Sequence, residues 1–99
     1  MSESIGKHLV NQVAQHFHRL PETRYFLSVV KDNADHQYNY FFYIRRHKVS
    51  TRSLPLGHEP AQLANLVSTL TTFRETYQLP VGLVGFNREE RQQLRRFTK

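Results

Sequence analysis

One stretch of the sequence combines side chains that can bind nucleic acid or another protein. Residues 37–52 read QYNYFFYIRRHKVSTR, so Tyr and Phe stand directly before a run of Arg and Lys. Aromatic rings can stack on unpaired bases while cationic groups hold the phosphates. Six residues form the candidate nucleic-acid-binding site: Phe41, Tyr43, Arg45, Arg46, Lys48 and Arg52. No acidic residue occurs between Asp35 and Glu59, so nothing nearby in the sequence offsets this positive charge.

The aromatic residues of this stretch divide into two rows, because successive side chains of a strand point to opposite faces. One row contains Tyr38, Tyr40, Phe42 and Ile44, and the other contains Phe41, Tyr43 and Arg45. The second row runs directly into charge, so we expect it to point outward and Phe42 to lie in the core. If Arg24, Phe26 and Ser28 lie beside this row, the outward face carries three rings between two guanidinium groups.

Three uses of such a face are compatible with the sequence. The rings can stack on bases, or they can form a protein interface, including the contact of a homodimer, because exposed aromatic patches with Arg are enriched at interfaces. In the third alternative, residues 80–86 or the last helix fold over this face and bury it.

The charge of the whole chain favours an anionic partner. Fourteen Lys and Arg, most of them Arg, stand against eight Asp and Glu, and the net charge is +6. Arg forms bidentate hydrogen bonds to phosphates and carboxylates and stacks on flat rings. This excess suits nucleic acid or an acidic protein, although a net charge of this size is also ordinary for a small domain.

The sequence contains no recognisable catalytic or metal-binding motif. Cysteine is absent, and the six His residues show no HxxxH or HExxH spacing. No Gly-rich phosphate loop or nucleophile motif is present either. We therefore expect a protein that is not an enzyme and needs no cofactor. The absence of cysteine, of a signal peptide and of a membrane-spanning stretch predicts a cytoplasmic location.

The first half of the chain predicts a helix followed by strands. Apolar residues recur at helical spacing over residues 5–19, with Ser4 as a candidate N-cap. Residues 24–31 and 38–46 are rich in aromatic and β-branched residues and predict a hairpin with a polar loop. Residues 48–54 predict a further, less regular strand.

The second half predicts helices separated by a short extended segment. The two prolines and the glycine of PLGHEP, residues 55–60, predict a loop, and Pro60 suits the first position of a helix over residues 60–77. Residues 81–86 predict a short extended segment. Asn87 and Glu90 have the spacing of a capping box for a last helix, which Leu94 and Phe97 must anchor.

The chain length of 99 residues suits one domain, residues 1–99. The predicted fold is α+β, in which helices pack on one face of a small antiparallel sheet of two to four strands, in the order α-β-β-(β)-α-(β)-α. The order of strands and helix over residues 24–77 is similar to that of the small three-stranded DNA-binding modules of some phage integrases. This resemblance concerns topology alone and assigns no functional residue.

Two functions remain as expectations. The first is a small regulatory or accessory protein that binds nucleic acid, with DNA as the expected target, through its basic and aromatic hairpin. The second is a protein-interaction module, such as an inhibitor or adaptor, whose aromatic face binds an acidic partner or a second copy of the chain. Phosphate binding weakens steeply with added salt, whereas binding through an aromatic protein interface does not. The salt dependence of the binding affinity therefore distinguishes the two functions.

Overall fold

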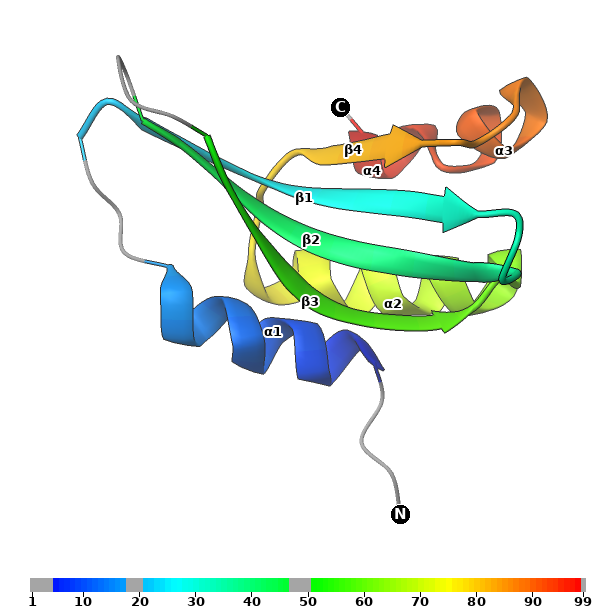
Figure 1. Cartoon of the computed structure of the whole chain (residues 1–99), viewed down its shortest axis with the longest axis horizontal. Coiled ribbons are helices and arrows are strands. Elements are labelled where there is room, and N and C mark those ends of the chain that lie inside the picture. Colours follow the sequence, from blue (N-terminus) through cyan, green and yellow to red (C-terminus); the bar gives the residue numbers. More distant parts are fainter. Residues whose placement is uncertain (1–4, 18–20, 47–50, 99) are drawn as a thin grey trace.

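The structure, a computed structural model, describes residues 5–17, 21–46 and 51–98. Four strands form one sheet, and helices pack against it (Figure 1). The elements in chain order are α1 (Ile5–His16), β1 (Thr23–Asp32), β2 (Gln37–Arg46), β3 (Arg52–Pro60), α2 (Leu63–Thr76), β4 (Val81–Val84), α3 (Arg88–Gln93) and α4 (Arg95–Thr98). The predicted α+β class and the element order are confirmed.

The strand order across the sheet is β3-β2-β1-β4. The pairs β1/β2 and β2/β3 are antiparallel, as predicted, whereas β4 runs parallel to β1. The sheet is therefore mixed. The parallel pairing follows from the long connection through α2, which returns the chain to the opposite end of the sheet (Figure 1). No helix among the described residues has the length and apolar character needed to span a membrane.

One face of the sheet forms the hydrophobic core with the helices. In the row of β2 that was expected to point inward, Tyr38, Tyr40 and Phe42 are buried and Ile44 is partly buried. Phe42 packs in one cluster with the inward row of β1 and with side chains from α1, α2 and α4. The helix residues of this cluster, together with Leu94 between α3 and α4, are Leu9, Val13, Leu66, Leu70, Phe73 and Phe97.

The prediction of a loop over residues 55–60 is wrong. These residues belong to strand β3, which pairs with β2 from Gln37 to Ile44. Strand β3 lies at the edge of the sheet, where a proline without an N–H group interrupts no interior ladder. A register shift beside Phe41 inserts one extra residue, and the inserted Leu56 is buried in the core. Of the predicted strand 48–54, residues 48–50 lie outside the described residues.

The start of α2 also differs from the prediction. Pro60 ends β3, and α2 begins at Leu63 after the extended residue Gln62. Burial of Leu66 and Phe73 decides where the helix packs, so the hydrophobic periodicity predicted the position of the helix correctly. The expectation that Pro60 is the first helical residue was wrong, because α2 begins three residues later.

Helix α1 lies against both α2 and β3. Gly6 allows the contact with α2, because a Cβ there would lie 2.8 Å from Thr72 Cβ. The first helix is therefore fixed to the helical layer by a close approach that a larger residue would prevent.

The C-terminal segment is held to the sheet at its start and at its end. Asn87 and Glu90 form the predicted capping box of α3. Glu90 also forms a 2.8 Å ion pair with Lys31 of β1. Burial alone would raise the pKa of Glu90, but hydrogen bonds from Lys31 and from Asn87 N lower it below its usual range. Leu94 and Phe97 are buried, as predicted, so this segment packs on the helical side of the sheet.

Candidate functional site

The face of the sheet that points away from the core carries the aromatic row expected from the sequence. Cross-strand register places Arg24 beside Arg45, Phe26 beside Tyr43, and Ser28 beside Phe41. Residues paired in register share a face, so this arrangement confirms the expected neighbours. We call this surface the open face. Its residues are Arg24, Phe26, Ser28, Val30 and Asp32 of β1, Gln37, Asn39, Phe41, Tyr43 and Arg45 of β2, Ser53, Pro55, His58 and Pro60 of β3, and Gly82 and Val84 of β4.

The apolar residues of the open face take no part in the core. Phe26, Phe41 and Tyr43 are only partly buried and belong neither to the core cluster nor to the hydrophobic residues packed against it. Val84 at the β4 edge is 52% exposed. The third alternative from the sequence is wrong for the described residues, because β4 extends the sheet beside β1 and Phe97 lies in the core on the other side. No described helix covers the open face, so its rings and Val84 keep part of their apolar surface in contact with water, although Ser28 between them is only 4% exposed.

The rings form an ordered centre on this surface. The rings of Phe26 and Tyr43 are nearly parallel, with a centroid distance of 4.8 Å and an interplanar angle of 6°. Phe41 lies two residues further along β2 on the same face. Aromatic pairs in offset stacks stabilise one another beyond simple burial. The pair is therefore positioned before any partner arrives.

The charges of the open face lie at its two ends. Arg24 and Arg45 are exposed register partners at one end of the central strands. Neither guanidinium group forms an ion pair or a hydrogen bond with a described residue. Asp32 and Gln37 are partners at the other end, beside the β1–β2 turn. Asp32 Oδ1 accepts hydrogen bonds from Ala34 N and Asp35 N, which fixes this turn.

The six predicted site residues do not form a single cluster. Phe41, Tyr43 and Arg45 share the open face. Arg46 and Arg52 are exposed but lie on the opposite side, because Arg46 pairs with Thr23 and Arg52 pairs with Ile44 of the inward row. Lys48 lies outside the described residues. The pleat therefore separates the rings from two of the cations that follow them in the sequence.

Some open-face residues were not predicted as part of a site. Arg24 and Phe26 were expected there only if they lay beside the outward row of β2, and the register confirms this condition. Val30 and Asp32 continue the same row of β1, so extending the alternation by four residues would have found them. Val84 had no sequence signal, because the position of β4 beside β1 depends on a long-range parallel pairing.

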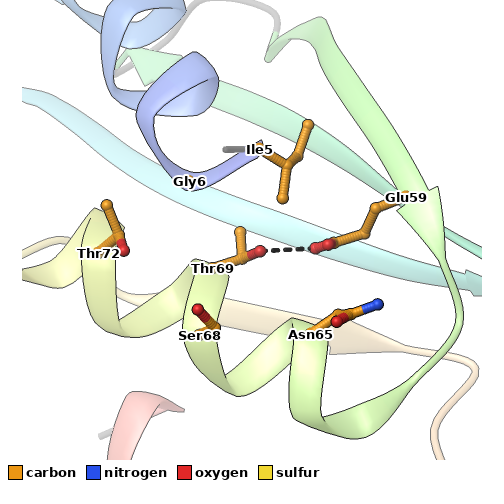
Figure 2. Close-up of a pocket in the computed structure, with 7 residues that line it drawn as sticks. All are labelled: Ile5, Gly6, Glu59, Asn65, Ser68, Thr69 and Thr72. Atoms are coloured by element: carbon orange, nitrogen blue, oxygen red, sulfur yellow. Dashed lines mark hydrogen bonds between the residues drawn. The ribbon is translucent and has the colours of Figure 1, made fainter. Parts of the chain in front are cut away.

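A second candidate, a pocket beside Glu59, lies on the helical side. It has a volume of about 190 Å³ and is lined by Ile5, Gly6, Glu59, Asn65, Ser68, Thr69 and Thr72, where α1, α2 and β3 meet (Figure 2). Glu59 is only 9% exposed. Its Oε2 accepts hydrogen bonds from Tyr40 Oη and, at 2.7 Å, from Thr69 Oγ1.

These hydrogen bonds give Glu59 a structural role. They connect β2, β3 and α2, and within the described residues no buried side-chain polar atom lacks a partner. Burial and then the hydrogen bond to Glu59 raise the pKa of Tyr40 above its usual value, so the phenol remains a donor. Among the described residues that line it, the pocket contains no second titratable side chain that would work with Glu59 in acid–base chemistry.

The described residues contain no cluster of three or more His, Asp or Glu side chains that would bind a metal ion. His8, for example, makes a structural contact, since its Nε2 lies 3.0 Å from Leu56 O and donates to it. Comparisons with known protein families, curated protein sequences and solved structures found no match to this chain.

Proposed function

We propose that the protein is an interaction module that binds a protein partner through its open face. The observation that carries this proposal is the uncovered apolar centre of the sheet, formed by Phe26, Phe41, Tyr43, Val30 and Val84. Antiparallel sheets normally present polar residues on a face that meets water. An apolar face with polar and charged residues at its ends has the anatomy of a protein interface.

The charge distribution supports protein over nucleic acid on this face. Only Arg24 and Arg45, among the described residues, place a full positive charge on it, because Arg46 and Arg52 lie on the opposite side. Asp32 adds a carboxylate that would repel a phosphate backbone at the far end. The aliphatic side chains of Val30 and Val84 offer hydrophobic contact but neither base stacking nor phosphate binding.

A photo-crosslinking experiment tests the class of partner. Tyr43 is replaced by the photoreactive p-benzoylphenylalanine in cells that make the protein, and the cells are irradiated. We expect adducts that protease degrades and nuclease leaves intact. The matched control carries the same residue at Ala64, which is exposed on α2 away from the open face, and should give no such adducts.

Two outcomes of this experiment would contradict the proposal. Adducts that nuclease removes would show that the open face contacts nucleic acid. Equal adduct yields at positions 43 and 64 would show that position 43 contacts its neighbours only by random collision.

Nucleic-acid binding is the second candidate, and one observation favours it. The stacked rings of Phe26 and Tyr43 lie next to the guanidinium groups of Arg24 and Arg45, which form no ion pair with any described residue, in a chain with net charge +6. This arrangement suits single-stranded nucleic acid, whose bases are free to stack.

Because Arg45 and Arg46 point to opposite faces of β2, substituting each of them tests which face binds nucleic acid. Binding of labelled single-stranded DNA, single-stranded RNA and duplex DNA is followed by fluorescence anisotropy at two salt concentrations. If the open face binds the strand, Arg45→Gln should weaken binding several-fold while Arg46→Gln, on the other side, has little effect. Equal effects of the two substitutions, or no salt-dependent binding, would reject base stacking on the open face.

A further inference from the structure

We propose that the partner of the open face is a second copy of the chain, packed face to face with its strands running in the opposite direction. This inference rests on the proposed function and adds the identity and the register of the partner. A twofold axis would lie between the two sheets, across the strands. The axis would pass over the level of Ser28 and Phe41, the middle of the five register levels shared by β1 and β2 on this face.

The charged ends of the open face select this orientation. With the axis across the strands, Arg24 lies over Asp32 of the second copy, and Arg45 lies over Gln37 of the second copy. With the axis along the strands, Arg24 and Arg45 would meet the same two residues of the second copy. Four guanidinium groups would then face one another, and like charges in contact are unfavourable. The required groups are available, because within the described residues the guanidinium groups of Arg24 and Arg45 have no ion-pair or hydrogen-bond partner and Asp32 Oδ2 accepts no hydrogen bond.

The side chains between the ends also match under this symmetry. Phe26 would lie over Val30 of the second copy, so that an apolar ring meets an apolar side chain. Tyr43 would lie over Asn39, whose amide can accept from the phenol. At the axis, Phe41 would meet its own copy, at the level of Ser28 and Gly82. In this arrangement apolar side chains therefore face apolar ones, and the Tyr43 hydroxyl faces a hydrogen-bond acceptor.

The size of the face predicts the strength of this dimer. β1, β2 and β3, spaced about 4.8 Å apart, cover about 14 Å across the sheet and about 33 Å along it, since β1 has ten residues. β4 has only four residues and adds a strip of about 4.8 Å by about 13 Å. Each copy would therefore bury roughly 540 Å² and the pair roughly 1,100 Å², a size typical of weak or transient interfaces. We expect a reversible dimer that dissociates on dilution in the micromolar range.

A double-mutant cycle measured by sedimentation equilibrium tests the register. Asp32→Asn keeps the side-chain oxygen that caps the turn but removes the charge, and it should raise the dimer dissociation constant about 3- to 10-fold. Arg24→Glu should raise it more, because the introduced carboxylate would face Asp32 of the second copy. In the Arg24→Glu background, Asp32→Asn should lower the dissociation constant. This reversal of sign is specific to contact between positions 24 and 32 across the axis.

Two further variants serve as controls. Arg46→Glu changes the net charge as Arg24→Glu does but lies on the other side of the sheet, so it should leave the dissociation constant within about twofold. Phe41→Glu places charges at the axis and should give a monomer. Far-ultraviolet circular dichroism of every variant verifies that the fold is retained.

Several results would overturn the proposal: a monomeric wild-type protein at every concentration, tighter association of Arg24→Glu, or the same direction of change for Asp32→Asn in both backgrounds. A dimer that Phe41→Glu leaves intact would place the contact elsewhere and would also overturn it. Failure here is distinguishable from failure of the proposed function. Photo-crosslinking of position 43 to a different protein would leave the function standing while rejecting the second copy.

Discussion

Phe26 and Tyr43 stack with a centroid distance of 4.8 Å on the side of the sheet that no helix in the described part of the chain covers. The two rings order each other and lie outside the core, and because they are only partly buried, part of their apolar surface stays in contact with water after folding. Hydrophobic burial is the main favourable contribution to association as well as to folding. The strand pairing that positions these two rings therefore also forms the centre of the proposed interface.

The two faces of β2 predict opposite effects of neighbouring Phe substitutions. Phe42 is fully buried, so Phe42→Ala should lower the free energy of unfolding by about 3–5 kcal/mol. Phe41 is only partly buried, so Phe41→Ala should cost about 1 kcal/mol. Urea unfolding at a protein concentration too low for self-association measures both. Equal losses at the two positions would mean that the open face is packed against something in the single chain.

This contrast was predictable from the sequence, because the side-chain period of a strand is two. The alternation along residues 38–46 identified Phe42 as inward and the row of Phe41 and Tyr43 as outward, and the burial of these residues agrees. The same alternation, applied to the basic residues, would have separated Arg45 from Arg46. The cations are neighbours in the sequence, but the pleat of the strands places Arg45 on one face and Arg46 and Arg52 on the other.

Other features depend on contacts that no local pattern encodes. Proline and glycine in residues 55–60 favour a turn, but a position at the sheet edge tolerates the prolines. Gly57 faces α1, where a Cβ would lie 3.2 Å from Ile5 Cδ1, so its small size allows the helix to approach. The burial of Glu59 depends on Tyr40 and Thr69, which come from different elements. Each of these features follows from tertiary packing.

Tyr40 should make the folded protein sensitive to alkaline pH. Burial raises its pKa above the usual 10.0, so above about pH 10 the unfolded chain loses a proton that the folded chain keeps. The free energy of unfolding should then fall as pH rises, by up to about 1.4 kcal/mol per pH unit from this residue. In Tyr40→Phe the fall should be shallower, although Tyr38, whose pKa burial also raises, still contributes. Urea unfolding across this pH range compares the slopes, and an unchanged slope in Tyr40→Phe would contradict the assignment.

Gly6 should resist a substitution that usually strengthens a helix. Gly→Ala in a helix interior normally stabilises by up to about 1 kcal/mol. Here a Cβ would lie 2.8 Å from Thr72 Cβ and 3.3 Å from Thr69 O, so Gly6→Ala should lower the melting temperature by separating α1 from α2. Gln15→Ala, at an exposed position of the same helix, should have little effect. A higher melting temperature for Gly6→Ala would show that the two helices do not approach this closely.

The capping box of α3 should contribute to the anchoring of the C-terminal segment. Asn87 Oδ1 accepts from Glu90 N at 2.8 Å, so Asn87→Ala should cost about 1 kcal/mol of unfolding free energy. Asn87→Ser, which keeps a capping oxygen, should restore most of this loss. Thermal and urea unfolding measure both variants. If alanine and serine behave alike, the cap does not stabilise α3.

The most direct test of the antiparallel pairing is a nuclear Overhauser measurement between two copies of the chain. Isotope-labelled and unlabelled protein are mixed at a concentration that favours association, and filtered spectra select contacts between copies. We expect transfer between the Phe26 ring and the methyl groups of Val30 in the second copy. Transfer between the Phe26 rings of the two copies would indicate that the twofold axis runs along the strands, so that the strands of the two copies are parallel. An associated protein without any contact between copies at Phe26, Val30 or Phe41 would show that the open face is not the interface.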